Sequence, residues 1–198
     1  MSWLNFLKPK KDYPEFWQDY LTKIKTDNTE HFVAFDCETT GLNPKKDRIL
    51  SIGAVRFTAE RIWIKENKEW FLNQSQEGSE SIKIHGILPS TSSEALLTES
   101  QAIIAFLDYI GNATLVGHHL NFDIAMVNMA LKRLGAGRLK NAQKDTNSLY
   151  KQKGHFAHEQ NFSLDELSKE FHIKTSNRHT ALGDAYITAQ LFQRMCSI

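Results

Sequence analysis

The sequence predicts an α/β fold in which a mixed central sheet, with three antiparallel strands and then parallel ones, is flanked by helices. Two observations lead to this fold class. Short apolar runs bounded by turn residues dominate the stretch after residue 31, which is typical of strands. After residue 100 the apolar residues recur mainly at helical spacing. A chain of 198 residues, 41% of them hydrophobic, can bury one such core.

The strands are predicted as follows. Phe32 to Phe35 is an uninterrupted apolar run, as expected for a strand that is buried on both faces. Ile49 to Phe57 and Arg61 to Leu72 predict two further strands, which should form an antiparallel hairpin beside the first. Ala113 to Val116 predicts a later strand that begins the strand-helix alternation.

Helices are predicted mainly in the second half of the chain. Ser163 and Glu166 have the spacing of a capping box and mark one helix start. The other predicted helices cover Gln101 to Ile110, Ile124 to Leu134, Thr146 to Gln152 and a segment from about Asp184 towards Met195.

Residues 1 to 30 predict an N-terminal helical extension, with residues 31 to 198 as the main domain. Pro14 opens a helix with one apolar stripe, and two interpretations of that stripe are open. It packs on its own domain, or it serves a protein partner or self-association. The stripe consists of Phe16, Trp17, Tyr20, Leu21 and Ile24, preceded by Trp3, Leu4, Phe6 and Leu7.

The composition favours a cytoplasmic protein that does not enter a membrane. Two cysteines, Cys37 and Cys196, suit a reducing compartment, and no segment is apolar enough to span a bilayer. A net charge of +1 argues for a short single-stranded nucleic-acid footprint rather than long-range duplex binding. Local bases at Lys45, Lys46 and Arg48 either contact phosphate or form a solvated face.

Asp36 and Glu38 follow the first apolar run. Side chains at i and i+2 of a strand point to the same side, so the two carboxylates should lie together. Such a pair raises one pKa or recruits a hard cation, although a pair of solvated turn acids is the simpler alternative. Thr39, Thr40 and Leu42 come next and offer two hydroxyls and an apolar side chain, which suits a nucleotide.

Two further segments carry acids at helix starts. In Gly117 to Asp123, Asn121 is the expected N-cap, and Asp123 in the first turn is favoured by the helix dipole, so it could be a simple capping acid. In the segment from Arg178 to Asp184, His179 precedes the last predicted helix. A histidine titrates near neutral pH and can take a proton from a metal-acidified water.

These three segments, in this order, resemble the motifs of the DnaQ-like, or DEDDh, 3'-5' exonucleases, a family that includes the proofreading epsilon subunit of bacterial DNA polymerase III. The resemblance implies a ribonuclease-H-like fold and two divalent ions, Mg²⁺ or Mn²⁺. It also implies that His179 is the general base and that the metal ligands are Asp36, Glu38, Asp123 and Asp184.

The resemblance further implies a pocket for the 3'-terminal nucleotide. A segment Ile84 to Ile87 is similar to a family stretch that helps to hold this nucleotide. One departure is His119, which stands where the family usually has Asn. His155 and His158 are expected to lie in a polar loop rather than to form a metal site. The implied pocket residues are Thr39, Thr40, Leu42, His85, His118 and Phe122.

The predicted activity is hydrolysis of single-stranded DNA from its 3' end to nucleoside 5'-monophosphates. Two alternatives stay open: a 3'-5' exoribonuclease of the same family, and a polymerase-associated interaction module with little activity. The chain ends at Ile198, soon after the last predicted helix, so a long C-terminal tether is not expected. We therefore expect a free-standing nuclease, or one that joins a partner through its N-terminus.

Overall fold

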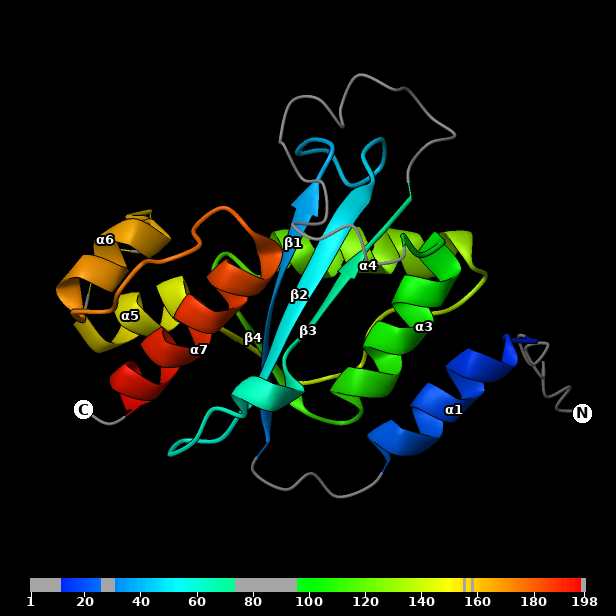
Figure 1. Ribbon diagram of the computed structural model, residues 1–198, viewed down its shortest axis with the longest axis horizontal. Helices are drawn as coiled ribbons and strands as arrows, with labels where there is room; N and C mark the ends of the chain where they lie inside the picture. Colours follow the sequence, from blue (N-terminus) through cyan, green and yellow to red (C-terminus); the bar gives the residue numbers. More distant parts are fainter. Residues whose placement is uncertain (1–11, 26–30, 74–95, 155, 158, 197–198) are drawn as a thin grey trace, which may run out of the picture.

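The molecule is built on a five-stranded sheet in the order β3-β2-β1-β4-β5 (Figure 1). β1, β2 and β3 are antiparallel, whereas β4 runs parallel to β1 and β5 parallel to β4. The predicted mixed sheet is confirmed. The computed structural model describes residues 12–25, 31–73, 96–154, 156–157 and 159–196. The strands are β1 (Phe32–Thr39), β2 (Ile49–Phe57), β3 (Lys68–Phe71), β4 (Thr114–Gly117) and β5 (Gln143–Asp145).

Three strands differ from the sequence-based expectation. β1 continues beyond Phe35 to Thr39, so that Asp36 and Glu38 lie inside the strand. The predicted strand Arg61 to Leu72 is wrong in its first half, where a 3₁₀ helix (Ile64–Glu66) precedes β3. This segment is rich in charges and lacks the apolar alternation that would hold it on the sheet. β5 was not predicted, because its three residues are polar.

Helices cover both faces of the sheet (Figure 1). One core lies between the sheet and α1, α3 and α4, and a second lies under α7, which α5 and α6 flank. Alternate residues of β1 therefore serve different cores, with Phe35 and Cys37 on the first and Ala34 on the second. The helices are α1 (Glu15–Ile24), α3 (Glu99–Ile110), α4 (Asn121–Arg133), α5 (Thr146–Gly154), α6 (Leu164–Glu170) and α7 (Ala181–Cys196).

Two helix starts show how local sequence fixes the ends of these elements. The predicted capping box of α6 is confirmed, because the backbone N–H of Glu166 donates to Ser163 Oγ and the N–H of Ser163 donates to Glu166 Oε2. The predicted N-cap Asn121 is wrong. α4 begins at Asn121 itself, and the N–H of the preceding Leu120 donates to the Asp145 carboxylate at 2.8 Å. A distant carboxylate thus replaces a local cap.

The apolar stripe of α1 packs on its own domain, as the first interpretation of this helix expects. Trp17 and Tyr20 are buried in the core that α3 and α4 share. The Tyr20 hydroxyl donates to Asn141 Oδ1 at 2.5 Å and accepts from the Lys140 N–H at 2.8 Å. The apolar stripe of α1 is thus covered by other parts of the same domain. Trp3, Leu4, Phe6 and Leu7 lie outside the described residues.

Gly53 on β2 lets the start of α7 approach the sheet backbone. A Cβ built at Gly53 would lie 2.1 Å from the Leu182 backbone nitrogen. Any larger residue would therefore push α7 away. Gly53 is also the register partner of Asp36 on β1. This close approach brings the first turn of α7 beside the end of β1 that carries the acids.

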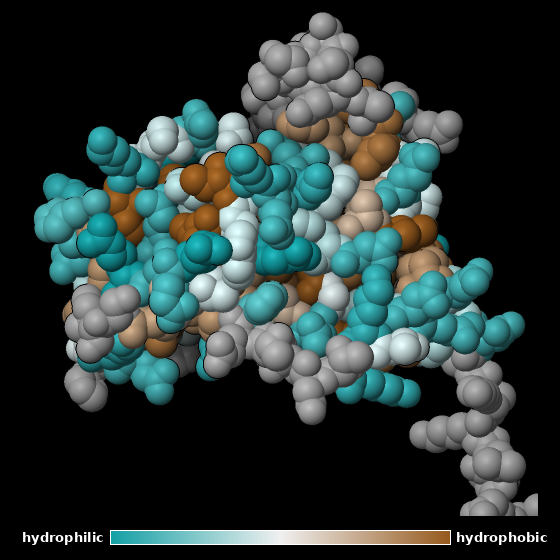
Figure 2. Space-filling view, turned by 60° about the horizontal axis from the view of Figure 1, so that its bottom comes forward, coloured by the Kyte–Doolittle hydropathy of each residue, from teal (hydrophilic) through white to brown (hydrophobic). Residues whose placement is uncertain are grey.

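The surface that Figure 2 shows is mainly hydrophilic, with hydrophobic residues in separate groups. Among the described residues, the exposed large hydrophobic side chains come from four different segments, at Leu42, Ile64, Leu96 and Phe156. None of the helices in this part of the chain has the length and apolar character needed to cross a membrane.

Candidate active site

Asp36 and Glu38 lie on the face of β1 that α7 covers. They are register partners of Gly53 and Ser51 on β2, and Cys37 between them points into the opposite core. Both carboxylates are only partly buried. The strand period predicted from the sequence therefore places the two acids side by side at the end of a buried strand.

Asp123 joins this pair from the first turn of α4. Its side chain is 4% exposed, and its Oδ1 accepts a hydrogen bond from the Cys37 N–H at 3.0 Å. The donor belongs to the residue between Asp36 and Glu38. Asp123 is thus more than a capping acid, because it ties the start of α4 to the strand that carries the other two acids.

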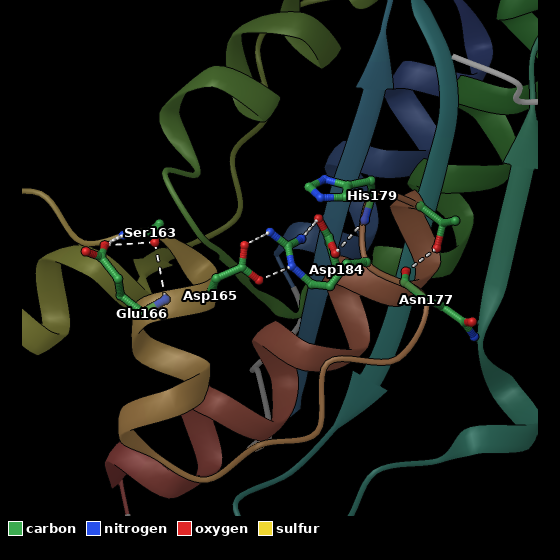
Figure 3. A network of polar contacts seen from close by, with 8 residues as sticks. Ser163, Asp165, Glu166, Asn177, His179 and Asp184 are labelled. Carbon is green, nitrogen blue, oxygen red and sulfur yellow. Dashed lines mark hydrogen bonds and ion pairs between the residues drawn. The ribbon is translucent and has the colours of Figure 1, made fainter.

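Asp184 completes the group from the first turn of α7, which Gly53 seats against β2. Its Oδ1 accepts from the backbone N–H of His179 at 3.3 Å, and its Oδ2 accepts from Arg178 Nη1. Figure 3 shows these contacts at the start of the helix. Residues far apart in the sequence therefore present four carboxylates to one region.

The four carboxylates act on one another electrostatically. Burial raises the pKa of Asp36 well above its ordinary value, and the charges of Asp123, Asp184 and Glu38 raise it further. Burial also raises the pKa of Asp123 to about 7, although the hydrogen bond from the Cys37 backbone opposes this. Like charges held this close favour either a bound proton or a bound cation.

The donor atoms fit a hard divalent cation. All four side chains offer oxygen ligands, which Mg²⁺ and Mn²⁺ prefer. Beside them, the buried Ser51 Oγ has no hydrogen-bond partner among the described residues, although Ser51 faces Glu38 across the strands. In the part of the chain that the structure describes, no three acids, histidines or cysteines are already grouped as a metal site. Asp123 and Asp184 instead accept hydrogen bonds from protein groups, Asp123 from the Cys37 N–H and Asp184 from Arg178.

His179 stands at the entrance to α7 with an exposed side chain. Its backbone has a φ of +62°, in the left-handed region that side chains rarely adopt. Such strain persists where the surroundings impose it, and it is common at functional sites. In Figure 3 the imidazole lies beside Asp184.

His118 has a different environment from the one that the family resemblance implies. Its Nδ1 lies 2.9 Å from Thr146 Oγ1 and its Nε2 lies 3.0 Å from the Phe162 carbonyl oxygen. Burial and, to a smaller extent, the charge of the nearby His119 lower the pKa of His118 to about 4. A neutral imidazole with both nitrogens engaged attracts phosphate poorly. The geometry therefore favours a role in joining β4 to α5 and α6.

The loop after β1 holds other predicted pocket residues. Asp47 organises it by accepting from the Thr40 hydroxyl at 3.2 Å and from the Asn43 N–H at 2.7 Å. The Thr39 hydroxyl donates to the Gly41 carbonyl at 2.8 Å. Leu42 is 85% exposed at the tip of the loop and is free to meet an apolar ligand.

The other residues predicted to contact the nucleic acid differ in their surroundings. Phe122 is partly buried against the core below α4. Lys45 and Lys46 are exposed, whereas Arg48 Nη1 donates to the Lys46 carbonyl at 3.1 Å. The placements of His85, His155 and His158 lie outside the described residues.

Sequence reasoning missed three residues that support the site. Arg178 contacts Asp184 and also Asp165 on α6, and Ser51 faces Glu38. The position of Arg178 directly before His179 was a usable signal. Asp165 and Ser51 gave none, because their proximity depends on helix packing and strand register.

His119, which replaces the usual Asn, also has a left-handed backbone, with a φ of +57°. Asn tolerates this conformation better than His. We expect His119→Asn to raise the free energy of unfolding by up to about 1 kcal/mol, measured by urea denaturation. His31→Asn, at an exposed position whose backbone is not in the left-handed region, serves as the control and should not be stabilising. Equal or lower stability of His119→Asn would contradict this explanation.

The sequence is similar to known proteins. Residues 33–192 match the model of the RNase T family, described as exonuclease. Over 166 residues, or 83% of the chain, the sequence is 36% identical to the PolC-type DNA polymerase III of Caldanaerobacter subterraneus subsp. tengcongensis. It is 32% identical over 167 residues, again 83% of the chain, to that of Halalkalibacterium halodurans. The chain spans 11% of the length of each polymerase.

Solved structures of exonuclease I have the same fold. E. coli exonuclease I in complex with a dA16 oligonucleotide aligns with a TM-score of 0.66 at 18% identity, over 85% of this chain and 41% of that one. Exonuclease I from Methylocaldum szegediense aligns with a TM-score of 0.67 at 20% identity, over 84% and 40% of the two chains. At these identities the likeness concerns the ribonuclease-H-like fold alone. The family match and the ordered motifs show that the chain belongs to the DnaQ-like family of 3'-5' exonucleases.

Proposed function

We propose that this protein hydrolyses single-stranded DNA from its 3' end to nucleoside 5'-monophosphates, with two divalent ions, Mg²⁺ or Mn²⁺, as cofactors. The observation that carries the proposal is the convergence of Asp36, Glu38, Asp123 and Asp184 from three separate elements. Several carboxylates grouped at the end of a strand repel one another, and this repulsion destabilises the fold unless cations are bound. The names of the relatives support DNA as the substrate, since they are DNA polymerases and an exonuclease solved with an oligonucleotide.

The side chains have distinct parts in the proposed reaction. The four carboxylates would hold the divalent ions, which would supply acidification of a water molecule and charge stabilisation for the leaving oxygen. His179 is placed to accept the proton of that water, because its imidazole is exposed beside Asp184. The new bond joins the water oxygen to phosphorus, and the bond from phosphorus to the 3'-oxygen breaks. The leaving 3'-oxygen takes up a proton from solvent and becomes a hydroxyl, and His179 releases the proton that it accepted, which returns the side chain to its starting state.

The same end of the sheet offers groups for the terminal nucleotide. Leu42 projects from a loop that Asp47 braces, and it can contact a base or sugar. Phe122 adjoins Asp123 at the start of α4 and offers a second apolar surface. Lys45 and Lys46 can neutralise phosphates of the strand. His85 stays a prediction from the family resemblance.

Digestion of matched 5'-labelled single-stranded DNA and RNA oligomers tests the proposal. With Mg²⁺ or Mn²⁺ we expect DNA to shorten stepwise from the 3' end, and Asp36→Asn to stop the reaction. Asp108→Asn is the matched control, because Asp108 is an exposed acid paired with Lys23. Faster digestion of RNA would move the assignment to an exoribonuclease. Failure to cut either oligomer with either ion would contradict the proposal and favour an interaction module.

A further inference from the structure

Arg178 joins two carboxylates from different helices. Its Nε and Nη2 donate to the two oxygens of Asp165 on α6, at 2.7 and 3.2 Å, and its Nη1 donates to Asp184 on α7. The side chain is only 16% exposed. In Figure 3, Asp165 and Asp184 lie on either side of these contacts. Two contacts to one carboxylate and a third to another fix the orientation of the guanidinium.

The positive charge of Arg178 also acts beyond its direct contacts. It opposes the rise in the pKa of Asp36 that burial and the neighbouring acids cause. Both oxygens of Asp184 accept hydrogen bonds from protein groups, one from Arg178 and one from the His179 backbone. An ion that uses Asp184 as a ligand therefore approaches an oxygen that already accepts a hydrogen bond, and at Oδ2 it also meets the positive charge of Arg178.

We propose that Arg178 acts as a built-in counter-ion, which neutralises part of the carboxylate group until divalent ions displace its Nη1 from Asp184. The inference rests on the proposed function, because it requires those ions at these acids. Asp165 keeps its two contacts with the guanidinium during the exchange, so Arg178 stays beside His179. Arg178 is thus a positioning residue that sets the ion concentration at which the site fills.

Calorimetric titration with Mn²⁺ alone tests this exchange. We expect Arg178→Gln to bind Mn²⁺ at least about fivefold more tightly than the unmodified protein, because the competing charge is gone. Arg178→Lys keeps the charge but loses the planar fork, so its affinity should fall between the two. Arg133→Gln is the matched control. It breaks a similar two-contact pair, with Glu99, between α3 and α4, and should leave the affinity unchanged.

Thermal unfolding in a chelator gives a second readout. Without metal, Arg178→Gln should melt at a lower temperature than the unmodified protein. Saturating Mn²⁺ should make the difference between the two melting temperatures smaller. Equal or weaker Mn²⁺ binding by both Arg178 variants would overturn the inference. If Asp36→Asn nevertheless abolished binding, the proposed function would stand. Absence of Mn²⁺ binding by the unmodified protein would overturn both.

Discussion

Asp36→Asn is expected to abolish exonuclease activity and, without metal, to make the protein more stable. Asn has nearly the same size as Asp but cannot supply an anionic ligand, and metal-dependent charge stabilisation contributes several kcal/mol to such reactions. We therefore expect turnover to fall by at least about 10³-fold. Stability should rise because the substitution removes one of four mutually repelling charges.

The stability gain should depend on pH in a defined direction. The folded-state pKa of Asp36 is raised, so the folded protein holds a proton that the unfolded chain releases more readily. The unmodified protein therefore loses stability as the pH rises from the ordinary Asp value through the raised folded pKa. Asn does not titrate, so the advantage of Asp36→Asn should be larger at about pH 8 than at about pH 5.

Urea unfolding in a chelator measures this gain, which we expect to be about 1 to 3 kcal/mol at the higher pH. Asp108→Asn, at an exposed acid paired with Lys23, should change neither activity nor the pH profile. Saturating Mg²⁺ should reverse the order of stability, because the ions stabilise only the protein that binds them. A destabilised Asp36→Asn protein would mean that repulsion does not dominate at this position.

The sequence was sufficient to predict the positions of the site residues that lie on regular strands and helices. The i and i+2 spacing of Asp36 and Glu38 placed both acids on one face of a strand, and β1 has this geometry. Ile49–Phe57 forms a strand with the predicted bounds, because apolar residues recur along it and are buried. Periodicity also located α3 and α7, with ends that differ by a few residues.

Features that depend on tertiary packing could not be derived in this way. Asp145 replaces Asn121 in satisfying the start of α4 only because β5 lies beside β4. The family resemblance implies His118 as a pocket residue, but it gives no sign that the packing of α5 and α6 engages both of its nitrogens. The Arg178 contact with Asp165 likewise requires α6 to pack beside α7. Each case involves a partner that lies 13 or more residues away.

His179→Ala is expected to lower turnover by at least about 10²-fold while leaving oligonucleotide binding largely intact. The imidazole is exposed beside Asp184 and makes none of the carboxylate contacts that hold the site together. Its loss should therefore slow proton removal without disturbing the metal ligands. Single-turnover digestion would measure the chemical step, and fluorescence anisotropy in Ca²⁺ would measure binding.

His172→Ala is the matched control, because His172 is also exposed and also has a positive φ, of +53°. Any cost of placing Ala in a left-handed backbone should then appear in both variants, whereas the loss of turnover should appear only at position 179. Added imidazole should restore part of the rate of His179→Ala if the side chain acts as a base, since a small base can occupy the space it leaves. Near-normal rates would remove His179 from the mechanism and assign proton removal to solvent.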